Sequence, residues 1–301
     1  MIDLSIIIVS YNTKEFLKKC LLSIAQHKPN KFTVEVIVVD NHSTDGSVEE
    51  IQSSKFKVQN DSLKLKIIEN EKNLGFSKAN NRGIQKAKGR YILFLNPDTE
   101  LSQNVISEMV AFMDENREVG AATCKILMPN GKMDEACHRG FPTPWGAFSY
   151  FLGLSKLFPR SRLFSSYTLG WKNFEKIHKI DACAGAFMMV RRKAGEEIGW
   201  WDENYFWYGE DLDFCYRLKE KGWEIDFVPT VSILHYKGVS AGIRNNSKHL
   251  TTADRETRRR ATIARFEAMR IFYKKHYEKL YPRILTKLVY RGISLKEWLT
   301  T

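Results

Sequence analysis

The sequence has no hydrophobic run long enough to cross a membrane. Its longest apolar runs cover residues 4–9 and 91–95, whereas a membrane-spanning helix needs about 20 apolar residues. The N-terminus opens directly on a strand pattern and lacks the basic-then-apolar form of a secretory leader. We therefore expect a protein that stays in the cytoplasm.

Cysteines are few and widely separated. There are five, no two of them form a Cys-x-x-Cys pair, and their number is odd. Neither a zinc site nor a disulfide framework is therefore indicated. We expect the cysteines to be small core residues in a reducing compartment.

Both common glycine-rich phosphate loops are also absent. No Gly-x-Gly-x-x-Gly follows the first apolar run, and no Gly-Lys-Ser/Thr occurs anywhere, which excludes the dinucleotide fingerprint and the P-loop. Polar residues stand in their place. Ser10-Tyr11-Asn12 follows the first apolar run, and Asp40-Asn41 ends the second.

Acidic residues are outnumbered by basic ones, which gives a formal net charge of +12. Such a charge implies an anionic partner: a nucleotide, an anionic lipid or a nucleic acid. Residues 254–283 hold ten Lys or Arg against four Asp or Glu, so we expect the excess to lie away from the site inferred below. A hydrophobic content of 43% and a charged content of 27% predict a folded protein.

Strand and helix patterns alternate in the first part of the chain, which predicts a mainly parallel sheet covered by helices on both faces. A capping box, Ser47 with Glu50, is expected to start one of the helices. Strands are predicted at residues 4–9, 34–40, 65–69, 91–95 and 119–126, and helices at 13–26, from 47, at 77–88 and at 102–116.

The second half of the chain is less regular. Residues 141–175 are rich in aromatics and contain three prolines, which predicts an irregular excursion, a substrate-facing loop or lid. Residues 181–190 form a buried segment and 225–229 a strand pattern. Residues 254–281 are helical, with one stripe of Ile263, Phe266, Met269, Phe272 or Tyr273, His276 and Leu280.

The most informative stretch is Asn96-Pro97-Asp98, which ends the apolar run 91–95. Proline cannot donate to a strand ladder, so the strand stops there and presents Asp98 at the carboxyl edge of the sheet, where α/β sheets bind ligands. A carboxylate there suits Mg²⁺ or Mn²⁺ shared with a diphosphate. The same residue types are also ordinary in a turn, so the choice depends on other segments.

Two of those segments carry further candidates. Glu210 and Asp211 begin a helical pattern, where carboxylates are stabilised by the helix dipole. Asp211 is equally well placed for a general base, because the aromatic residues 200–208 beside it suit a sugar cleft. His235 follows a strand. A histidine there is more often structural, although beside Asp98 it would complete a metal site.

Taken in order, these motifs resemble the family 2 glycosyltransferases with the GT-A fold. The subgroup most resembled is that of bacterial rhamnosyltransferases and related galactofuranosyltransferases. The resemblance covers about residues 3–240. It rests on Ser5 to Asn12, Val36 to Asn41, Asn73-Leu74-Gly75-Phe76 with Asn80-Asn81, Leu95 to Asp98, Gly185-Ala186-Phe187 with Arg191-Arg192, the Gly-Glu-Asp-Leu-Asp segment and His235.

The resemblance implies a role for each matching residue. Asp98 and His235 would hold Mg²⁺ or Mn²⁺, Asp40 would bind a pyrimidine base, and Asp211 would be the catalytic base of an inverting transfer. Trp207 and Glu210 would stand with Asp211 on the acceptor side. The segment His138-Arg139-Gly140 would lie near the donor. The residues expected at the nucleotide-sugar donor are Ser10, Tyr11, Asn12, Asp40, Asn73, Gly75, Phe76, Asn80, Asn96, Pro97 and Asp98.

From these implications we expect a three-layer α/β/α GT-A domain over residues 1–245 and a basic helical C-terminal region over 246–301. The expected reaction moves a sugar, by resemblance rhamnose, from a nucleotide-diphosphate donor to a glycan or lipid-linked acceptor in cell-surface polysaccharide synthesis. The alternatives are a sugar-nucleotidyltransferase and a non-catalytic basic binding module. The first normally carries a Gly-rich, Arg-containing loop after strand one, which is missing here, and the second has no nucleic-acid motif to support it.

The basic helix predicted at residues 254–281 has three interpretations. It is expected to pack on the catalytic domain with a solvated basic face. It also fits attachment to anionic lipid at the inner face of the cell membrane or contact with nucleic-acid phosphates. We favour the membrane, because acceptors in the resembled subgroup are often lipid-linked, and expect no nucleic-acid partner.

Overall fold

The protein was analysed as a computed structural model that describes residues 2–53, 64–238 and 253–300. Its centre is a mixed sheet of nine strands, in the order β3-β2-β1-β4-β8-β6-β9-β5, with β7 paired to β9. The strands are β1 (Leu4–Ser10), β2 (Val34–Asp40), β3 (Lys64–Glu69), β4 (Tyr91–Leu95), β5 (Thr99–Leu101), β6 (Val119–Leu127), β7 (His178–Lys179), β8 (Phe187–Arg191) and β9 (Glu224–His235).

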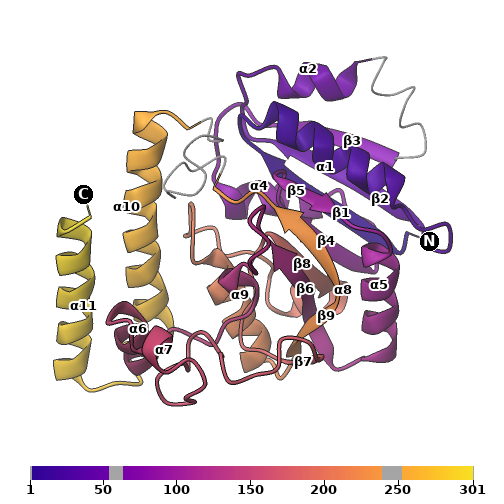
Figure 1. The fold of residues 1–301 in the computed structure, drawn as a ribbon. Coiled ribbons are helices and arrows are strands. Elements are labelled where there is room, and N and C mark those ends of the chain that lie inside the picture. Colours follow the sequence, from indigo (N-terminus) through magenta and orange to yellow (C-terminus); the bar gives the residue numbers. More distant parts are fainter. Residues whose placement is uncertain (1, 54–63, 239–252, 301) are drawn as a thin grey trace.

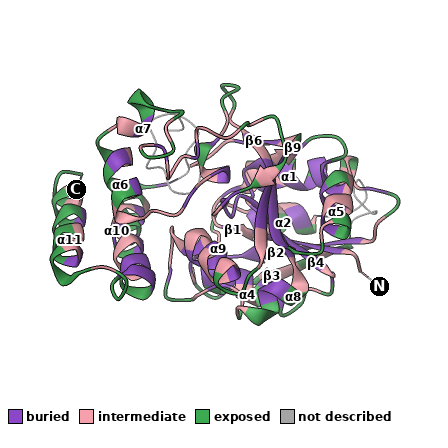
Figure 2. Ribbon diagram, turned by 90° about the horizontal axis from the view of Figure 1, so that it is seen from below, coloured by how far each residue is buried: buried purple, intermediate pink, exposed green. Residues whose placement is uncertain are grey.

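Helices cover both faces of this sheet and extend it on one side (Figure 1). They are α1 (Lys14–Gln26), α2 (Ser47–Gln52), α4 (Phe76–Ile84), α5 (Val105–Glu115), the 3₁₀ turn Glu135–Cys137, α6 (Pro144–Phe151), α7 (Leu154–Leu157), α8 (Arg192–Glu197), α9 (Glu210–Glu220), α10 (Arg255–Phe272), the π-helical turn Tyr273–Tyr277 and α11 (Arg283–Trp298). Figure 2 shows α4, α8 and α9 on one side of the strands, and α1 and α5 on the other.

The five predicted strands are all present within a residue of their expected ends. β2 and β4 are buried along their whole length, as expected for central strands covered on both faces. The five cysteines are free and buried, which confirms them as core residues.

The sheet is mixed rather than mainly parallel. β3, β2, β1 and β4 are parallel neighbours, and so are β6 and β9, but β8 runs antiparallel to both β4 and β6, and β5 and β7 run antiparallel to β9. Pairing of this kind is set by the long connections between the strands, which the local pattern does not reveal.

The last long strand continues past the point where the sequence predicts its end. The strand pattern was expected over residues 225–229, yet β9 runs on to His235. The register with β6 jumps at this place, from Cys124 opposite Val228 to Lys125 opposite Ser232. Residues 229–231 are therefore bulged out of the ladder, and the bulge accommodates a proline that cannot donate a hydrogen bond.

Three helix predictions need correction. The capping box is wrong: Gly46 is the N-cap, and the Ser47 hydroxyl bonds the Asp45 carboxylate instead. The helix predicted at 102–116 begins only at Val105, after Asn104 in a left-handed conformation. The helix predicted at 77–88 ends at Ile84.

Residues 141–175 are not wholly irregular. Thr143 caps α6, its hydroxyl accepting a hydrogen bond from the Gly146 amide, with Pro144 at the first helical position, where a missing N–H costs nothing. The short helix α7 follows. This segment lies beside the C-terminal helices (Figure 1).

The C-terminal helical region packs on the domain that contains the sheet, as expected, although its helix is interrupted. α10 passes into the π-helical turn and is followed by the separate helix α11. Phe266, Phe272 and His276 of the predicted stripe are buried, whereas Leu280 is exposed. No helix within the described residues is both long and apolar enough to cross a membrane.

Candidate active site

Pairing between β5 and β9 brings Asp98 and His235 together across 137 positions of sequence. Thr99 stands opposite His235 in this antiparallel pair, and the Tyr236 amide donates to the Asp98 carbonyl at 2.9 Å. The His235 Nε2 atom lies 3.2 Å from Asp98 Oδ1 and 3.5 Å from the Asn96 amide nitrogen. The structure thus joins the two residues that the sequence predicts as metal ligands.

Asp134, which the sequence analysis missed, stands on the other side of the same imidazole. Its Oδ2 lies 3.5 Å from His235 Nδ1, and its second oxygen pairs with Lys237. Burial would lower the pKa of His235, but the Asp98 and Asp134 carboxylates raise it to about 9. Burial would likewise raise the pKa of Asp134, but His235 and Lys237 hold it well below its usual range.

This arrangement fits a divalent cation that takes the place of the proton on His235 Nε2, because a histidine that ligates a metal must be neutral. Two ligands about 2.1 Å from one ion, at a right angle to each other, would be about 3 Å apart, close to the distance between Asp98 Oδ1 and His235 Nε2. A carboxylate behind the far ring nitrogen orients such a histidine, and Asp134 stands there. Within the described residues no group of three His, Cys, Asp or Glu could hold a metal by itself, so a diphosphate and water would have to supply the remaining ligands.

The ends of β1 and β2 carry the residues expected around the nucleotide. Asp40 is buried, and its Oδ2 accepts a hydrogen bond from the Ser43 amide at 2.8 Å. Its Oδ1 is buried and has no hydrogen-bond partner among the described residues. Ser10 bonds Thr13, and the Asn12 amide oxygen accepts from the Thr44 N–H at 2.8 Å. Ser10 and Asn12 therefore shape the loop, and Asp40 offers a spare acceptor.

A second loop, residues 70–76, is tied to the end of β2 by Asn41. The Asn41 amide donates to the Asn73 side-chain oxygen and the Gly75 carbonyl. Gly75 has a φ of +80°, and a Cβ there would lie 2.5 Å from the Phe206 carbonyl, so only glycine lets the loop approach residues 200–209. Phe76 donates its N–H to that same carbonyl at 2.9 Å. Asn80 is buried and bonds the Phe76 carbonyl.

Asp211 lies in the first turn of α9, as predicted, and forms an ion pair with Arg139. Arg139 Nη2 lies 2.7 Å from Asp211 Oδ2 and also donates to the Cys183 carbonyl. Burial would lower the pKa of Arg139, but the Asp211 carboxylate holds it above its ordinary value.

Glu210 differs from its neighbour. Its side chain is buried, and its Oε2 has no hydrogen-bond partner among the described residues. Burial and the charge of Asp211 raise the pKa of Glu210 to about 8. Glu210 is therefore mostly protonated at neutral pH. Of the two carboxyl groups, Asp211 is the one that forms an ion pair, with Arg139.

One short segment, residues 134–139, contacts both His235 and Asp211. Asp134 touches His235, and Arg139, five positions later, touches Asp211. Five residues span at most about 18 Å, so the two clusters lie on neighbouring parts of one region.

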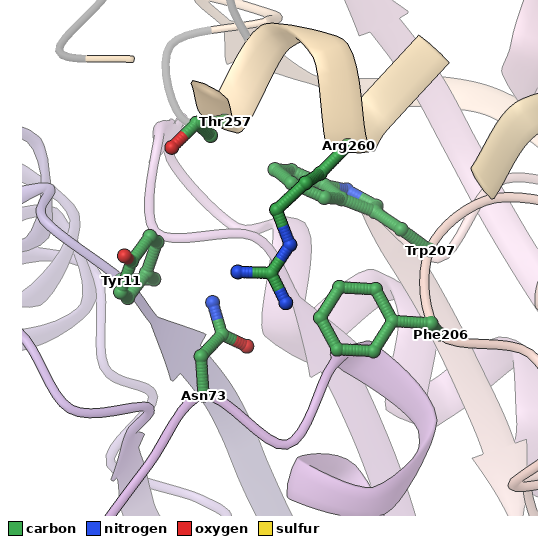
Figure 3. A pocket seen from close by; sticks show the side chains of 6 residues that line it. All are labelled: Tyr11, Asn73, Phe206, Trp207, Thr257 and Arg260. Atoms are coloured by element: carbon green, nitrogen blue, oxygen red, sulfur yellow. The ribbon is translucent and has the colours of Figure 1, made fainter. Parts of the chain in front are cut away.

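A small hollow gathers residues from four distant parts of the chain. Tyr11, Asn73, Phe206 and Trp207 line it together with Thr257 and Arg260 of α10. Figure 3 shows the Arg260 guanidinium reaching between Asn73 and Phe206, and it lies 5.6 Å from the centre of the Phe206 ring. Trp207, expected on the acceptor side, here accompanies two residues expected at the donor.

The position of Arg260 corrects the expectation that the C-terminal charge lies away from the site. The sequence offered no signal for this residue, because it is one of many arginines on α10 and its partners are more than 50 positions away. Only the packing of α10 against the loops brings it there.

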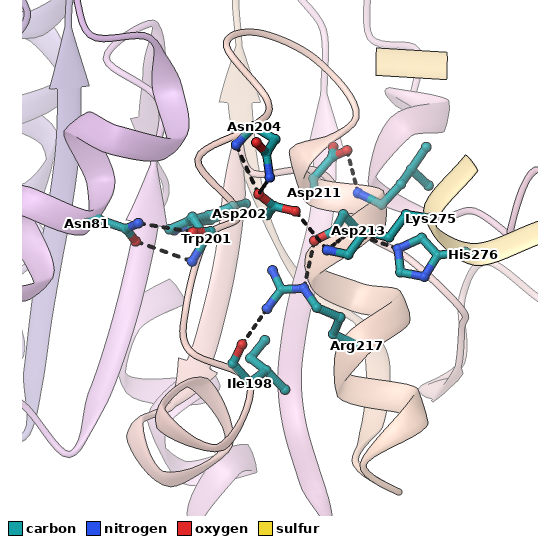
Figure 4. A network of polar contacts seen from close by, with 11 residues as sticks. Asn81, Ile198, Trp201, Asp202, Asn204, Asp211, Asp213, Arg217, Lys275 and His276 are labelled. Carbon is teal, nitrogen blue, oxygen red and sulfur yellow. Dashed lines mark hydrogen bonds and ion pairs between the residues drawn. The ribbon is translucent and has the colours of Figure 1, made fainter. Parts of the chain in front are cut away.

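The same C-terminal region is anchored behind Asp211 (Figure 4). Asp213 is fully buried and accepts hydrogen bonds from Lys275 and His276, at 2.7 Å each, and from Arg217 at 2.6 Å. Burial would raise the pKa of Asp213, but these partners lower it to about 2. The Asp213–Arg217 pair lies within α9 at i,i+4 spacing, whereas the two contacts from the π-helical turn join parts of the chain that are far apart in sequence. The division at residues 245 and 246 stays a prediction and falls outside the described residues.

Comparisons with known proteins agree with this architecture. The family model described as Glycosyl transferase family 2 matches residues 5–199. An N-acetylglucosaminyl-diphospho-decaprenol L-rhamnosyltransferase of Mycobacterium tuberculosis is 26% identical over 268 residues, 84% of this chain and 82% of that protein. Rhamnosyltransferase WbbL of Escherichia coli (strain K12) is 28% identical over 171 residues, 54% of this chain and 61% of that protein.

Among solved structures, GalNAc-T7 with UDP, GalNAc and Mn²⁺ aligns with a TM-score of 0.60 and 19% identity over 78% of this chain. The aligned part spans only 44% of that protein, and at this identity the likeness shows the fold alone. The family match ends before α9 and the end of β9, so the roles of Asp211 and His235 depend on the geometry described above. Because the family model covers more than half of the sequence, the chain belongs to glycosyl transferase family 2, and its fold is GT-A.

Proposed function

We propose that this glycosyltransferase moves a sugar, with inversion, from a nucleotide-diphosphate donor to a glycan or lipid-linked acceptor in cell-surface polysaccharide synthesis. The observation that carries the proposal is the Asp98–His235 pair at the carboxyl edge of the sheet, 3.2 Å apart and backed by Asp134. A bound Mg²⁺ or Mn²⁺ would there offset the charge that develops on the leaving diphosphate.

The donor would lie along the loops that follow β1, β2 and β4. The free, buried oxygen of Asp40 suits the ring N–H of a pyrimidine, because a buried acceptor without a partner costs about 1–3 kcal/mol unless a ligand satisfies it. Tyr11, Phe206 and Trp207 offer aromatic surfaces in the hollow that they form with Asn73 and Arg260. The backbone around Gly75, Phe76, Asn96 and Pro97 would pack on the diphosphate and sugar, while Ser10, Asn12, Asn73 and Asn80 hold these loops in place.

Asp211 would act as the general base. The acceptor hydroxyl oxygen would form its bond to the anomeric carbon while its proton passes to an Asp211 oxygen, and the bond to the diphosphate breaks with its electron pair leaving on that group. Arg139 would keep the Asp211 carboxylate oriented before the transfer. A single displacement of this kind inverts the anomeric centre, and general base catalysis contributes roughly 10²–10⁴ in rate.

The sugar and acceptor are proposed from the relatives. Two of them bear the name rhamnosyltransferase, and the name of one describes a diphospho-decaprenol substrate. We therefore propose rhamnose as the sugar, a lipid-linked diphosphate as the acceptor, and a site of action at the inner face of the cell membrane. Membership of family 2 leaves the nucleotidyltransferase and the non-catalytic binding module without supporting observations.

A thermal-shift panel tests the proposed donor class. UDP-, dTDP- and GDP-sugars are compared with and without Mn²⁺, since a ligand that binds only the folded state stabilises it by about 2.7 kcal/mol at a hundred times its Kd. We expect a rise in Tm with a pyrimidine nucleotide-sugar that grows when Mn²⁺ is present. No shift with any of these donors would contradict the proposal.

Arg260 should strengthen donor binding from the C-terminal helix. Arg260→Gln removes a cation that projects between Asn73 and Phe206, and a charge-assisted hydrogen bond to a phosphate is worth about 1.5–3 kcal/mol. We therefore expect the donor Kd to rise roughly 10- to 100-fold, measured by calorimetry, with kcat little changed. The matched control is Arg259→Gln, on the same helix and exposed; an equal loss in both variants would mean that Arg260 acts only through net charge.

A further inference from the structure

Exposed large apolar side chains are concentrated in two segments of this protein. Fifteen are exposed among the described residues, and thirteen of these lie within residues 145–163 or 280–299. The other two, Leu22 and Ile177, are isolated. Scattered single residues of this kind are ordinary, but a contiguous cluster marks an interaction surface.

The outward face of α11 carries the first group. Ile284, Leu288 and Leu295 recur at helical spacing, and Trp298 with Leu299 continues the stripe at the end of the helix. Their exposed fractions run from 56% to 77%. Thr286 and Ile293, on the opposite face, are the buried residues of this helix. Figure 2 shows α11 at the outer edge of the molecule, with α10 between it and the sheet. An apolar stripe on the face turned away from the core is the reverse of what a soluble helix presents.

The α6–α7 segment carries the second group. Seven large apolar side chains are exposed there, and Leu157 reaches 73%. The sequence has no acidic residue between Glu135 and Glu175. The exposed charges near these apolar residues are therefore basic: Lys156, Arg160 and Arg162.

The two groups meet. Lys296 of α11 lies 4.3 Å from the centre of the Phe151 ring at the end of α6. On α11 the exposed charged residues are again basic, namely Arg283, Lys287 and Arg291, and its one acid, Glu297, pairs with Arg270 of α10. The result is one surface in which aromatic and aliphatic side chains alternate with cations.

The composition of this surface indicates what kind of partner binds there. Basic residues interspersed with Trp, Phe and Leu suit an anionic bilayer, where the rings enter the interface and the cations meet lipid phosphates. A second copy of the chain would bring a cationic face against an identical cationic face, which disfavours that occupant. α10 has the cations but lacks the apolar side chains, because none of the fifteen exposed apolar residues lies on it.

We propose that the surface formed by α11 and the α6–α7 segment docks this protein on an anionic lipid bilayer. The inference rests on the proposed transfer to a lipid-linked acceptor and names the part of the protein that meets the membrane. It moves the attachment from the basic helix predicted at 254–281 to α11, later in the same C-terminal region, and to the α6–α7 segment, which was expected to be a substrate-facing loop or lid.

Flotation of the full chain with phosphatidylcholine vesicles, with and without phosphatidylglycerol, tests the proposal. We expect binding only to the anionic vesicles, weakened by high salt. The triple variant Leu288→Ser, Leu295→Ser, Trp298→Ser should weaken binding by at least about tenfold through lost apolar contact. Arg283→Gln with Lys287→Gln and Arg291→Gln should weaken it by roughly fivefold for each charge removed.

Two controls match these variants. Leu22→Ser with Ile177→Ser removes exposed apolar residues elsewhere, and Arg255→Gln with Arg259→Gln and Arg265→Gln removes three cations of α10. Both should retain vesicle binding within about twofold to fivefold. If the α10 variant loses as much binding as the α11 variant, or if the triple Ser variant floats normally, the proposed surface is wrong.

Two further measurements separate this inference from the proposed function. Sedimentation in the absence of lipid should give a monomer, and a concentration-dependent dimer that the triple Ser variant abolishes would overturn membrane docking in favour of self-association. The Tm rise with nucleotide-sugar should be the same in all of these variants. If it is present while vesicles are not bound, only the docking surface fails; if the unaltered protein shows no rise, the proposed donor chemistry fails instead.

Discussion

Asp211→Asn should lower kcat of sugar transfer by roughly 10²–10⁴, the contribution of a positioned general base, while the donor Kd stays within a few-fold of its original value. The amide keeps the shape of the side chain but cannot take the acceptor proton. The variant should therefore lose most of its transfer activity although it still binds the nucleotide-sugar. Single-turnover kinetics tests the loss of transfer, and calorimetry with the donor tests whether binding is retained. Retained turnover would show that Asp211 is not the base.

Glu210→Gln is the matched control, because it alters the adjacent carboxylate in the same helical turn. The raised pKa of about 8 means that Glu210 already carries a proton at neutral pH, so a neutral amide changes little there. The folded pKa lies above the unfolded value, which means that Glu210 lowers the stability of the native state progressively as pH rises from about 4.5 to 8. Glu210→Gln should remove that loss, and kcat should fall less than in Asp211→Asn.

The local elements of the fold were predictable where one physical signal dominates. β4 is a continuous apolar run, β2 is apolar except for Glu35, and each is bounded by a polar residue, Asn96 or Asp40. Both strands are buried along their whole length, as such runs predict. The antiparallel placement of β8 was not predictable, because nothing in residues 187–191 encodes which strand they meet. The extension of β9 was missed for a similar reason, since the bulge at Pro229 depends on the register with β6.

The residues of the candidate site were likewise predictable only in part. Asp98, Asp211 and His235 were predicted because each stands at the end of a strand or the start of a helix, where side chains are presented to ligands, and because the resemblance to family 2 glycosyltransferases favoured a functional role over a structural one. Asp134 and Arg260 were missed because their importance comes only from contacts. Asp134 looks like an ordinary acid before a short turn, yet it lies 3.5 Å from His235 Nδ1. Arg260 reaches the hollow only because α10 packs against the loops there. The sequence analysis had expected the basic residues of this helix to lie away from the site.

The charge network at Asp213 connects the C-terminal region to α9. Lys275 and His276 belong to the π-helical turn. Both bond Asp213 of α9, which lies two residues after Asp211. A fully buried carboxylate with three cationic or hydrogen-bonding partners is costly to break. The C-terminal region therefore supports the helix that carries the proposed base, and the same region supplies Arg260 to the hollow at Tyr11 and Asn73.

The second large effect is expected from the Asp98–His235 pair. Asp98→Asn should lower transfer by roughly 10²–10³, since metal stabilisation of a leaving group is worth several kcal/mol. It should also abolish the extra Tm rise that Mn²⁺ gives with the donor. Asp134→Asn should instead weaken Mn²⁺ binding by about 10- to 100-fold and be rescued by excess metal, because it orients His235 without being a ligand. Glu100→Gln is the matched control: Glu100 lies on β5 two residues beyond Asp98, but accepts from the Tyr236 hydroxyl. Full activity of Asp98→Asn, or equal activity of the unaltered protein with and without a chelator, would show that the pair serves structure alone.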